Sequence, residues 1–584
     1  MLCRLALCIL ASLASSAHAQ SELALRFATY LGGDGATVGL ATAIGPEGSV
    51  YVAAVTTAPD LPTMGAVQTY AGGADLYIAR LSATGALEAA TYLGGLGAEA
   101  VTALAVDDTG RLCLTGTTTS DDFPTRQPVA AYGGGPLLGL DGFVACLSAD
   151  GSALDFATHL GGSGEDVLTA LAVAPDGSLI VAGGTSSDDL PMTTGAAQPD
   201  HAGGDLFRTD AVVARLRPSG DAFGLDRVTY LGGSFDDAAT GVGVEASGRV
   251  WVTGQTSSDD FPTRQPVQAS YAGPLREMEG DGVLARLSAD LATLELATYL
   301  GGSLNDQPTG LVLRPDGGAV IVGYTDSPDF PTTGGVLQPA LSGRYDLFVS
   351  TLRETNGQLE IASSTYLGSD RGEVAGSHAA LDSEGRVWMA GLTAGATFPT
   401  PGAAFGLAGP LDGVLVQLDA NALASTTALG GNADDAISSL ALGDGVVCTT
   451  GSTDSSDFPT QGGSSLGGLS AEGSAFLACF DTDATSTPAE PLPSGAPTEH
   501  TLHPGAPNPF VRSTRLRFDV VSAEHAVLTV YDATGRELAT LVDGPYLPGR
   551  YAVDLDAQGW APGIYLVRLR VADNTMTRSL TLLR

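Results

Sequence analysis

The feature that most constrains this chain is an internal repeat. A phrase close to Thr-Tyr-Leu-Gly-Gly recurs seven times, at intervals of about 62 to 71 residues. A phrase close to Asp-Phe-Pro-Thr and a phrase typified by Asp141-Gly-Phe-Val-Ala-Cys-Leu147 recur in step with it. Repeats of this length indicate a supersecondary unit that buries its apolar surface against neighbouring copies. The leucines of the first phrase are Leu31, Leu93, Leu160, Leu231, Leu300, Leu367 and Leu429.

Each unit contains four short apolar segments separated by turn residues, which is the pattern of an antiparallel sheet. In the second unit these segments span residues 101–106, 111–117, 142–147 and 154–160. Tight turns that contain glycine connect the first segment to the second and the third to the fourth. A single sheet cannot bury both of its faces, whereas seven sheets stacked around an axis can. The sequence therefore predicts an all-β fold with a seven-bladed β-propeller.

The two ends of the repeat region complement each other. Residues 24–33 form a fourth segment with no three segments before it, and the last unit stops after its third segment at Phe480. We therefore expect the N-terminal strand to complete the last blade as its outermost strand. The units resemble the bacterial seven-bladed β-propeller repeat family, which carries the same Tyr-Leu-Gly-Gly and Asp-Phe-Pro-Thr phrases. The resemblance covers residues 24–483 and implies a fold but no single activity.

The N-terminus and the charge balance bear on where the chain works. Residues 1–19 have the features of a secretory signal peptide: Arg4, an apolar stretch, and the small-residue ending Ala17-His18-Ala19. No later stretch reaches the roughly 18 apolar residues of a membrane helix, so we expect an exported protein that is not an integral membrane protein. The chain has 65 acidic residues against 27 basic ones and a net charge of -38. Nucleic-acid binding is not expected, because a basic surface is absent.

Four cysteines follow the predicted signal peptide. When the units are aligned, Cys113 and Cys448 share one position in the second segment, and Cys146 and Cys479 share one position in the third. The other five units carry no cysteine at either position. Because the second and third strands of an antiparallel sheet are neighbours, we expect disulfides from Cys113 to Cys146 and from Cys448 to Cys479. The alternative is four small buried thiols.

One side of the predicted ring carries the variable loops. Strand parity places the loops between second and third strands on the same side as the crossovers to the next blade, and binding residues concentrate on such loops. A carboxylate begins the innermost strand in six of the seven units. Such a ring of oxygens could hold calcium, or each carboxylate accepts N–H bonds of its own crossover turn. These candidate metal ligands are Glu99, Asp166, Asp237, Asp306, Glu373 and Asp435.

The C-terminal part has a different composition. Residues 484–499 form a proline-rich linker, and residues 500–584 contain about seven short strands, as a small β-sandwich does. This region resembles the C-terminal sorting domain of type IX secretion substrates, an Ig-like fold related to flagellar hook-capping proteins. The resemblance implies passage through the outer membrane by the type IX secretion machinery and removal of the tail. An Ig-like accessory domain that stays attached is the alternative. The matching motifs contain Pro507, Asn508, Pro509, Phe510, Gly535, Arg536, Gly563 and Tyr565.

No catalytic motif occurs in its required setting, and no catalytic residue is assigned. The leading hypothesis is a non-enzymatic propeller, secreted or on the outer-membrane surface, that binds an extracellular glycan or protein through its long-loop side. One alternative is an extracellular carbohydrate-active enzyme, a hydrolase or lyase, on the same side. The other alternative is a structural component of a surface coat. Calcium is the only cofactor considered.

Overall fold

The computed structural model describes residues 23–583 apart from short gaps, so the predicted signal peptide lies outside the described residues. The chain is all-β, and the single helical element of the described residues is the short 3-10 turn η1 (Pro46–Gly48). No helix in this part of the chain is long and apolar enough to cross a membrane. The gaps are residues 204–207, 221, 275–279, 356, 396, 400–406, 420–421, 444, 483–489, 492–499, 504–507, 509, 511–512, 522–523, 533, 535, 547–548, 558–559 and 572–573.

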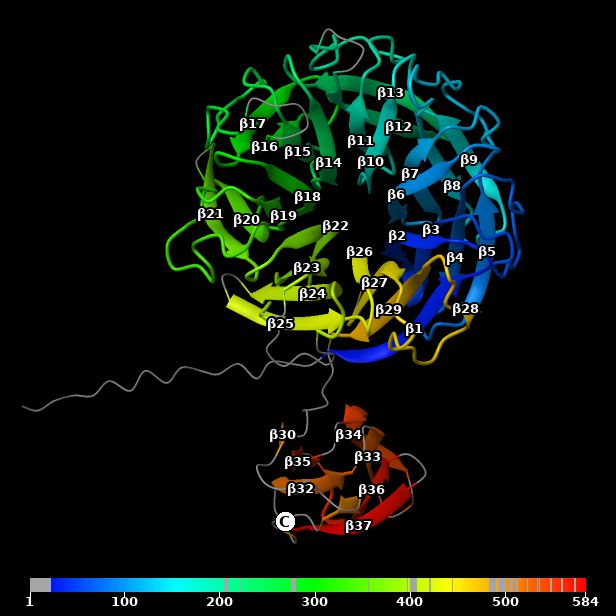
Figure 1. Cartoon of the computed structure of the whole chain (residues 1–584), viewed down its shortest axis with the longest axis vertical. Helices are drawn as coiled ribbons and strands as arrows, with labels where there is room; N and C mark the ends of the chain where they lie inside the picture. The colour runs from blue at the N-terminus through cyan, green and yellow to red at the C-terminus, as the bar shows by residue number, and fades with distance from the viewer. Residues whose placement is uncertain are drawn as a thin grey trace, which may run out of the picture.

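Antiparallel sheets built from residues 24–481 follow one another around a ring, as in a β-propeller (Figure 1). We number these sheets 1 to 7 in chain order, and each is given from its innermost strand outward. Sheet 1 is β2 (Thr37–Ile44), β3 (Val50–Thr56), β4 (Asp75–Leu81) and β5 (Leu87–Leu93). Sheet 2 is β6 (Glu99–Val106), β7 (Leu112–Thr118), β8 (Asp141–Leu147) and β9 (Leu154–His159). Sheet 3 is β10 (Asp166–Val173), β11 (Leu179–Thr185), β12 (Asp210–Ser219) and β13 (Ala222–Leu231).

The remaining sheets of the ring repeat this order. Sheet 4 is β14 (Asp237–Val244), β15 (Val250–Thr256), β16 (Asp281–Leu287) and β17 (Leu294–Leu300). Sheet 5 is β18 (Asp306–Leu313), β19 (Ala319–Thr325), β20 (Asp346–Thr355) and β21 (Gln358–Leu367). Sheet 6 is β22 (Glu373–Leu381), β23 (Val387–Thr393), β24 (Asp412–Asp419) and β25 (Ala422–Leu429). Sheet 7 is β26 (Asp435–Gly443), β27 (Val446–Thr453), β29 (Ser474–Asp481), β1 (Ala24–Gly32) and β28 (Leu466–Gly467).

The N-terminal strand closes the ring. β1 pairs antiparallel with β29, and its register sets Ala28 opposite Ala478 and Leu31 opposite Ala475. The predicted pairing of the first repeat phrase with the last unit is therefore confirmed. The innermost strand of sheet 1, β2, also contacts the innermost strand of sheet 7, β26. The sheets thus form a closed series with their first strands around the centre (Figure 1).

The two sides of the ring differ as the alternation of strand directions predicts. Short turns join the first strand to the second and the third to the fourth, and in sheet 2 they require glycines at φ +83° and +72°, Gly110 and Gly151. We call this the short-turn side. The opposite side carries the loops between second and third strands together with the crossovers between sheets, and we call it the long-loop side.

Some long loops also cover the outer edges of the sheets. After β3 the chain folds back beside β5, where Met64 and Ala90 exchange backbone hydrogen bonds of 3.0 and 2.9 Å. Arg126 pairs in the same way with Ala157 on the outermost strand of sheet 2. An uncovered edge strand presents unpaired N–H and C=O groups to other chains. The loops therefore protect the rim of the ring, a role that the sequence did not reveal.

Two further four-stranded sheets share one core, and residues 501–583 contribute all of their strands except β30 (Glu490–Pro491). This two-residue strand lies within the predicted linker and pairs with β35 (Gly549–Asp556). The first sheet is completed by β32 (Ser513–Val520) and β31 (Thr501–Leu502). The second sheet is β34 (Glu537–Tyr546), β33 (Glu524–Tyr531), β36 (Gly563–Val571) and β37 (Asn574–Leu582).

Both predicted disulfides are present. Cys113 lies opposite Cys146 in the pairing of β7 with β8, and the two Cα atoms are 4.0 Å apart. Cys448 lies opposite Cys479 in the pairing of β27 with β29, again with the Cα atoms 4.0 Å apart. All four side chains are buried. The alternative of free thiols is therefore wrong, and the second bridge fixes the strand that receives β1.

Replacing Cys448 and Cys479 together by alanine should destabilise the ring by about 3 to 4 kcal/mol, since the bridge closes a loop of 31 residues in the unfolded chain. Denaturant unfolding of the oxidised proteins would measure the difference. The double alanine variant of Cys113 and Cys146 is the matched control, because it removes a similar loop without touching the closing sheet. Unchanged stability of both variants would contradict the expectation.

Candidate functional site

The six carboxylates that begin innermost strands accept hydrogen bonds from other residues of the ring. Glu99 is buried, and its Oε2 accepts the N–H of Gly95 at 3.0 Å. Its Oε1 accepts the hydroxyls of Thr118 at 2.7 Å and Ser120 at 2.5 Å. The other five carboxylates are buried too and accept the N–H of the second residue after the repeat leucine: Gly162 to Asp166, Gly233 to Asp237, Gly302 to Asp306, Ser369 to Glu373, and Gly431 to Asp435.

A second set of buried carboxylates lies beside the first. Asp75 begins the third strand of sheet 1, and its Oδ2 accepts the N–H of Ala71 at the end of the long loop at 2.6 Å. The same contact recurs in the next five sheets, so these aspartates hold the long loops against the strands. No role is predicted for these aspartates from the sequence, although their fixed place in the third repeat phrase is a visible signal. They are Asp141, Asp210, Asp281, Asp346 and Asp412.

A glycine separates the two carboxylates at each of these six joints between sheets. A Cβ atom on Gly94 would lie 2.5 Å from Glu99 Oε2 and 2.6 Å from Asp75 Oδ1. Real Cβ atoms do not approach oxygen so closely, so only glycine fits. The Tyr-Leu-Gly-Gly phrase therefore reflects the space that two carboxylates occupy. The equivalent glycines are Gly161, Gly232, Gly301, Gly368 and Gly430.

The carboxylate pairs are buried with few compensating charges. In the described part of the chain, the basic side chains within 4.0 Å of them are histidines: His159 lies 4.0 Å from Asp141, and His201 lies 3.9 Å from Asp210. Burial lowers the pKa of His159, which favours its neutral form. Oδ1 of Asp75, Asp141, Asp210 and Asp281 is buried and has no hydrogen-bond partner among the described residues. A buried carboxylate without a counter-charge favours its protonated form.

Burial raises the pKa of Asp141 and Asp281 to about 7 and the pKa of Asp75 to about 6. A nearby negative charge reinforces each rise: Asp166 for Asp141, Asp329 for Asp281 and Glu99 for Asp75. Burial also raises the pKa of Asp237 and Asp306 to about 7. It raises the pKa of Glu373 and Asp412 as well, so each joint holds at least one carboxyl with a raised pKa.

The metal prediction is not tested by this arrangement. The six candidate ligands begin strands of different sheets, and each meets a third-strand aspartate across a glycine instead of meeting the others. Within the described residues, no group of three or more histidine, cysteine, aspartate or glutamate side chains is arranged to hold a metal ion. Calcium binding therefore stays a prediction.

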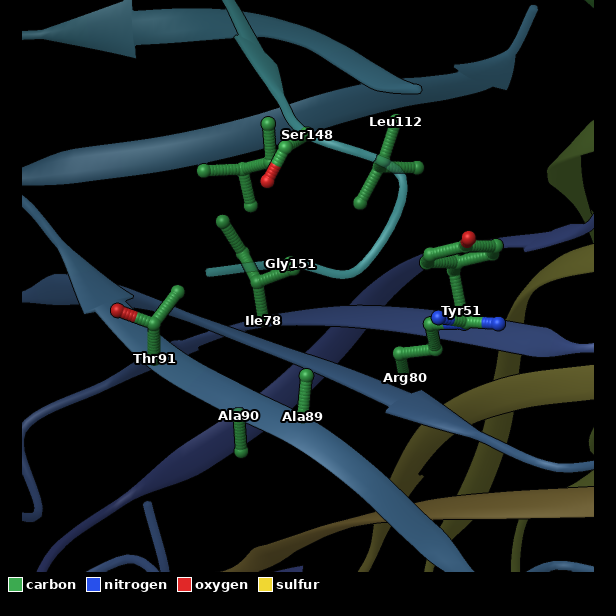
Figure 2. A pocket seen from close by; sticks show the side chains of 10 residues that line it. Tyr51, Ile78, Arg80, Ala89, Ala90, Thr91, Leu112, Ser148 and Gly151 are labelled. Atoms are coloured by element: carbon green, nitrogen blue, oxygen red, sulfur yellow. The ribbon is translucent and has the colours of Figure 1, made fainter. Parts of the chain in front are cut away.

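One described cavity lies on the long-loop side: a hollow between sheets 3 and 4, beside Leu231 and Phe261, whose volume of about 10 Å³ gives room for a single water molecule. Two further cavities lie elsewhere. Figure 2 shows a hollow between sheets 1 and 2, with Tyr51, Ile78 and Leu112 in its wall, and its volume of about 10 Å³ gives room for a single water molecule. A larger cavity of about 590 Å³ opens on the short-turn side between sheets 6 and 7. Its wall contains Arg386, which pairs with Asp382 and Glu384. Neither of these two cavities matches the predicted location of a binding site.

The residues of the predicted sorting motif are partly described. Phe510 is buried in the core of the C-terminal sheets, and Tyr565 packs at its edge. The side chain of Asn508 accepts the N–H of Thr581 at 2.8 Å. Gly563 begins β36, and Arg536 lies 3.2 Å from Asp532 in an exposed turn. Pro507, Pro509 and Gly535 lie outside the described residues.

Comparisons with known proteins do not assign a family. No protein-family model matches the chain, and no curated protein is similar to it. Among solved structures, a protein of unknown function from Dyadobacter fermentans has a TM-score of 0.36 at 10% identity, covering 79% of this chain and 98% of that one. A GH43 β-xylosidase/α-arabinofuranosidase from a compost metagenome has a TM-score of 0.27 at 13% identity, covering 59% and 97%. A glycoside hydrolase family 32 structure from Bifidobacterium adolescentis has a TM-score of 0.25 at 11% identity, covering 95% and 78%. TM-scores this low assign no activity.

The joint carboxyls should make the ring most stable at mildly acidic pH. Because their pKa values are raised, the folded ring binds their protons more tightly than the unfolded chain does. Their contribution is complete below the unfolded pKa of about 4 and is lost as the pH rises through about 6 to 7. Calorimetry should show Tm falling by about 5 °C between pH 5.5 and 8.5.

Asp141→Asn should reduce this fall, because asparagine keeps the shape of the protonated carboxyl and does not titrate. Asp150→Asn is the control: Asp150 lies in an exposed turn of the same sheet, and hydrogen bonds from Ser148 and Ser152 lower its pKa to about 2. A Tm that stays level or rises with pH over this range would refute the explanation.

Proposed function

We propose that residues 24–481 form an exported seven-bladed β-propeller that binds an extracellular ligand, a glycan or a protein, through its long-loop side. The distribution of exposed apolar side chains carries this proposal. In the described part of the ring, all of the large ones except Val374 stand on long loops or crossovers, and the short turns carry none. Met64 lies on the rim, where its loop pairs with the outermost strand of sheet 1. Leu96 and Leu304 stand on crossovers at the long-loop side, and exposed apolar surface there favours a binding role for that side. The exposed apolar residues on long loops and crossovers are Met64, Leu96, Leu137, Leu138, Val267, Leu304, Leu337 and Leu469.

Export is supported by the disulfides as well as by the predicted signal peptide. Disulfides persist in oxidising compartments and are rare in the cytosol. Both bridges are buried between neighbouring strands, so they stabilise the frame instead of serving as reactive groups. A secreted or surface-exposed protein fits this chemistry.

Binding is favoured over hydrolysis by the state of the repeated carboxylates. A typical glycosidase needs two accessible carboxyl groups that flank the substrate. The carboxylates at the joints are buried, and they accept hydrogen bonds from their own crossovers and long loops. These carboxylates therefore have a structural role in the ring, and we assign no catalytic residue.

The C-terminal sheets are proposed to be an Ig-like sorting domain that the type IX secretion machinery recognises. The support is the sequence motif, together with a compact core that includes Phe510 and the described strands from β31 to β37. Such a domain would deliver the ring to the outer-membrane surface or to the medium.

The binding proposal is tested by screening the recombinant full chain against polysaccharide and protein arrays, with and without calcium. We expect saturable binding of at least one glycan or protein and no turnover of it. Release of reducing sugar or of unsaturated ends from any polymer would show a carbohydrate-active enzyme instead. Spontaneous assembly into sheets or filaments without ligand binding would show a coat component.

Removing residues 500–584 should stop the final step of export. In a bacterium with a type IX system, the shortened protein is expected to accumulate in the periplasm, whereas the full chain reaches the surface or the medium. Cell fractionation and immunoblotting measure the distribution. A reporter fused to residues 484–584 is the converse test, and its retention in the periplasm would contradict the proposed role.

A further inference from the structure

The long loop of sheet 2 is longer than that of sheet 1, as are the long loops of sheets 3 and 4. In sheet 1 this loop ends with Tyr70 to Asp75, where the Tyr70 hydroxyl donates to Gly73 O at 2.6 Å. In sheet 2 the matching segment runs from Tyr132 to Asp141 and is four residues longer. The Tyr132 hydroxyl donates to Gly139 O at 2.7 Å, so both ends of the insertion keep the contacts of the shorter loop. We call residues 133–140 the leucine loop.

A carboxylate from the next crossover holds the leucine loop in one shape. Oε1 of Glu165 accepts the N–H groups of Leu137 at 2.7 Å and Leu138 at 2.8 Å, and its Oε2 accepts the N–H of Leu140 at 2.9 Å. These bonds outweigh partial burial and lower the pKa of Glu165. At the corresponding place before sheet 2 the chain has Ala98. The shorter loop of sheet 1 thus has no such clamp, whereas the long loop of sheet 3 has a related one, in which Asp236 accepts the N–H of Thr209 at 3.1 Å.

The clamped loop presents two leucines to solvent. The exposed fraction is 64% for Leu137 and 69% for Leu138. Leu96, on the preceding crossover, is 74% exposed. None of these side chains fills the core of the ring, and a fixed loop that displays apolar groups is unfavourable unless a partner covers them. A preorganised loop also loses little conformational entropy on binding.

Two acidic side chains, Asp121 and Asp122, lie near Tyr132 and Leu96 respectively. Burial raises the pKa of the Tyr132 phenol most, and the charges of Asp141 and Asp121 raise it further, so Asp121 lies near this side chain. Asp122 accepts the N–H of Leu96 at 2.9 Å, and both aspartates are exposed. A partner that covers the leucines therefore meets negative charge at their border, which favours cationic groups on the partner.

We propose that the leucine loop is a docking site for an extracellular polypeptide segment in which apolar side chains are flanked by lysine or arginine. This inference rests on the proposed binding function of the long-loop side and names the class of its partner. A polypeptide fits better than a glycan, because leucine offers neither a donor nor an acceptor to sugar hydroxyls. Apolar contact supplies affinity, and the nearby aspartates supply orientation and association rate.

The experiment uses random peptides displayed on phage and selected on the full chain. Enriched sequences should combine leucine, isoleucine, valine or phenylalanine with lysine or arginine, and synthetic copies should bind more weakly at high salt. The double variant Leu137→Ser with Leu138→Ser should weaken their binding at least about tenfold by calorimetry. Ile564→Ser is the matched control: this side chain is also apolar and 58% exposed, but it lies on β36 of the C-terminal sheets, so the affinity should stay unchanged.

Glu165→Ala tests the clamp separately. It keeps both leucines but removes the acceptor of three N–H groups, so affinity should fall by about three- to tenfold through lost preorganisation. The inference is overturned if no peptide is enriched, or if enriched peptides bind the double leucine variant as tightly as the unchanged chain. If no peptide is enriched but a glycan binds both forms equally, the inference is overturned and the proposed function stays intact. Failure of the array screen as well would overturn both.

Discussion

The structure depends on the pairing of β1 with β29, which joins the beginning of the repeat region to its end. Besides the strand hydrogen bonds, Arg26 donates to Asp481 at 2.7 Å, and Ala28 and Gln461 exchange backbone hydrogen bonds. β1 also supplies Phe27 and Leu31 to the core that sheet 7 shares with sheet 1. Without this strand, the last sheet would expose both an edge and part of that core. The disulfide on the other side of β29 fixes the same strand from its second neighbour.

At six of the joints, neighbouring sheets are linked by a local arrangement of carboxylates around glycine. One carboxylate orients the crossover, the other holds the end of the long loop, and the glycine leaves room for both. Hydrogen bonds from N–H and hydroxyl groups offset part of the cost of burying the charge. Protonation offsets another part where the pKa is raised.

The sequence was sufficient for features that depend on local pattern and chain order. Alternating segments predicted the sheets, the unpaired segment at residues 24–33 predicted ring closure, and aligned cysteines predicted both bridges. It was insufficient where two distant segments meet. The contact of Asp75 with Gly94 and the clamp of Glu165 on Leu137 join residues about 19 and 28 positions apart. The repeat phrases record which residues recur but not which of them meet, because these contacts depend on how one sheet packs against the next.

Repetition itself separates frame from function in this molecule. A residue type present at one position in almost every unit has a structural role that is common to the joints. The buried carboxylates and their glycines are of this kind. A ligand that contacts one sector of the ring needs a feature that the other sectors lack. Among the described residues, the pair of exposed leucines Leu137 and Leu138 is such a departure. Glu165, which precedes Asp166 of the repeated set, holds them by the same crossover chemistry with which Asp236 holds part of the long loop of sheet 3. The stable symmetric joint thus supplies the rigidity on which an asymmetric binding loop can be built.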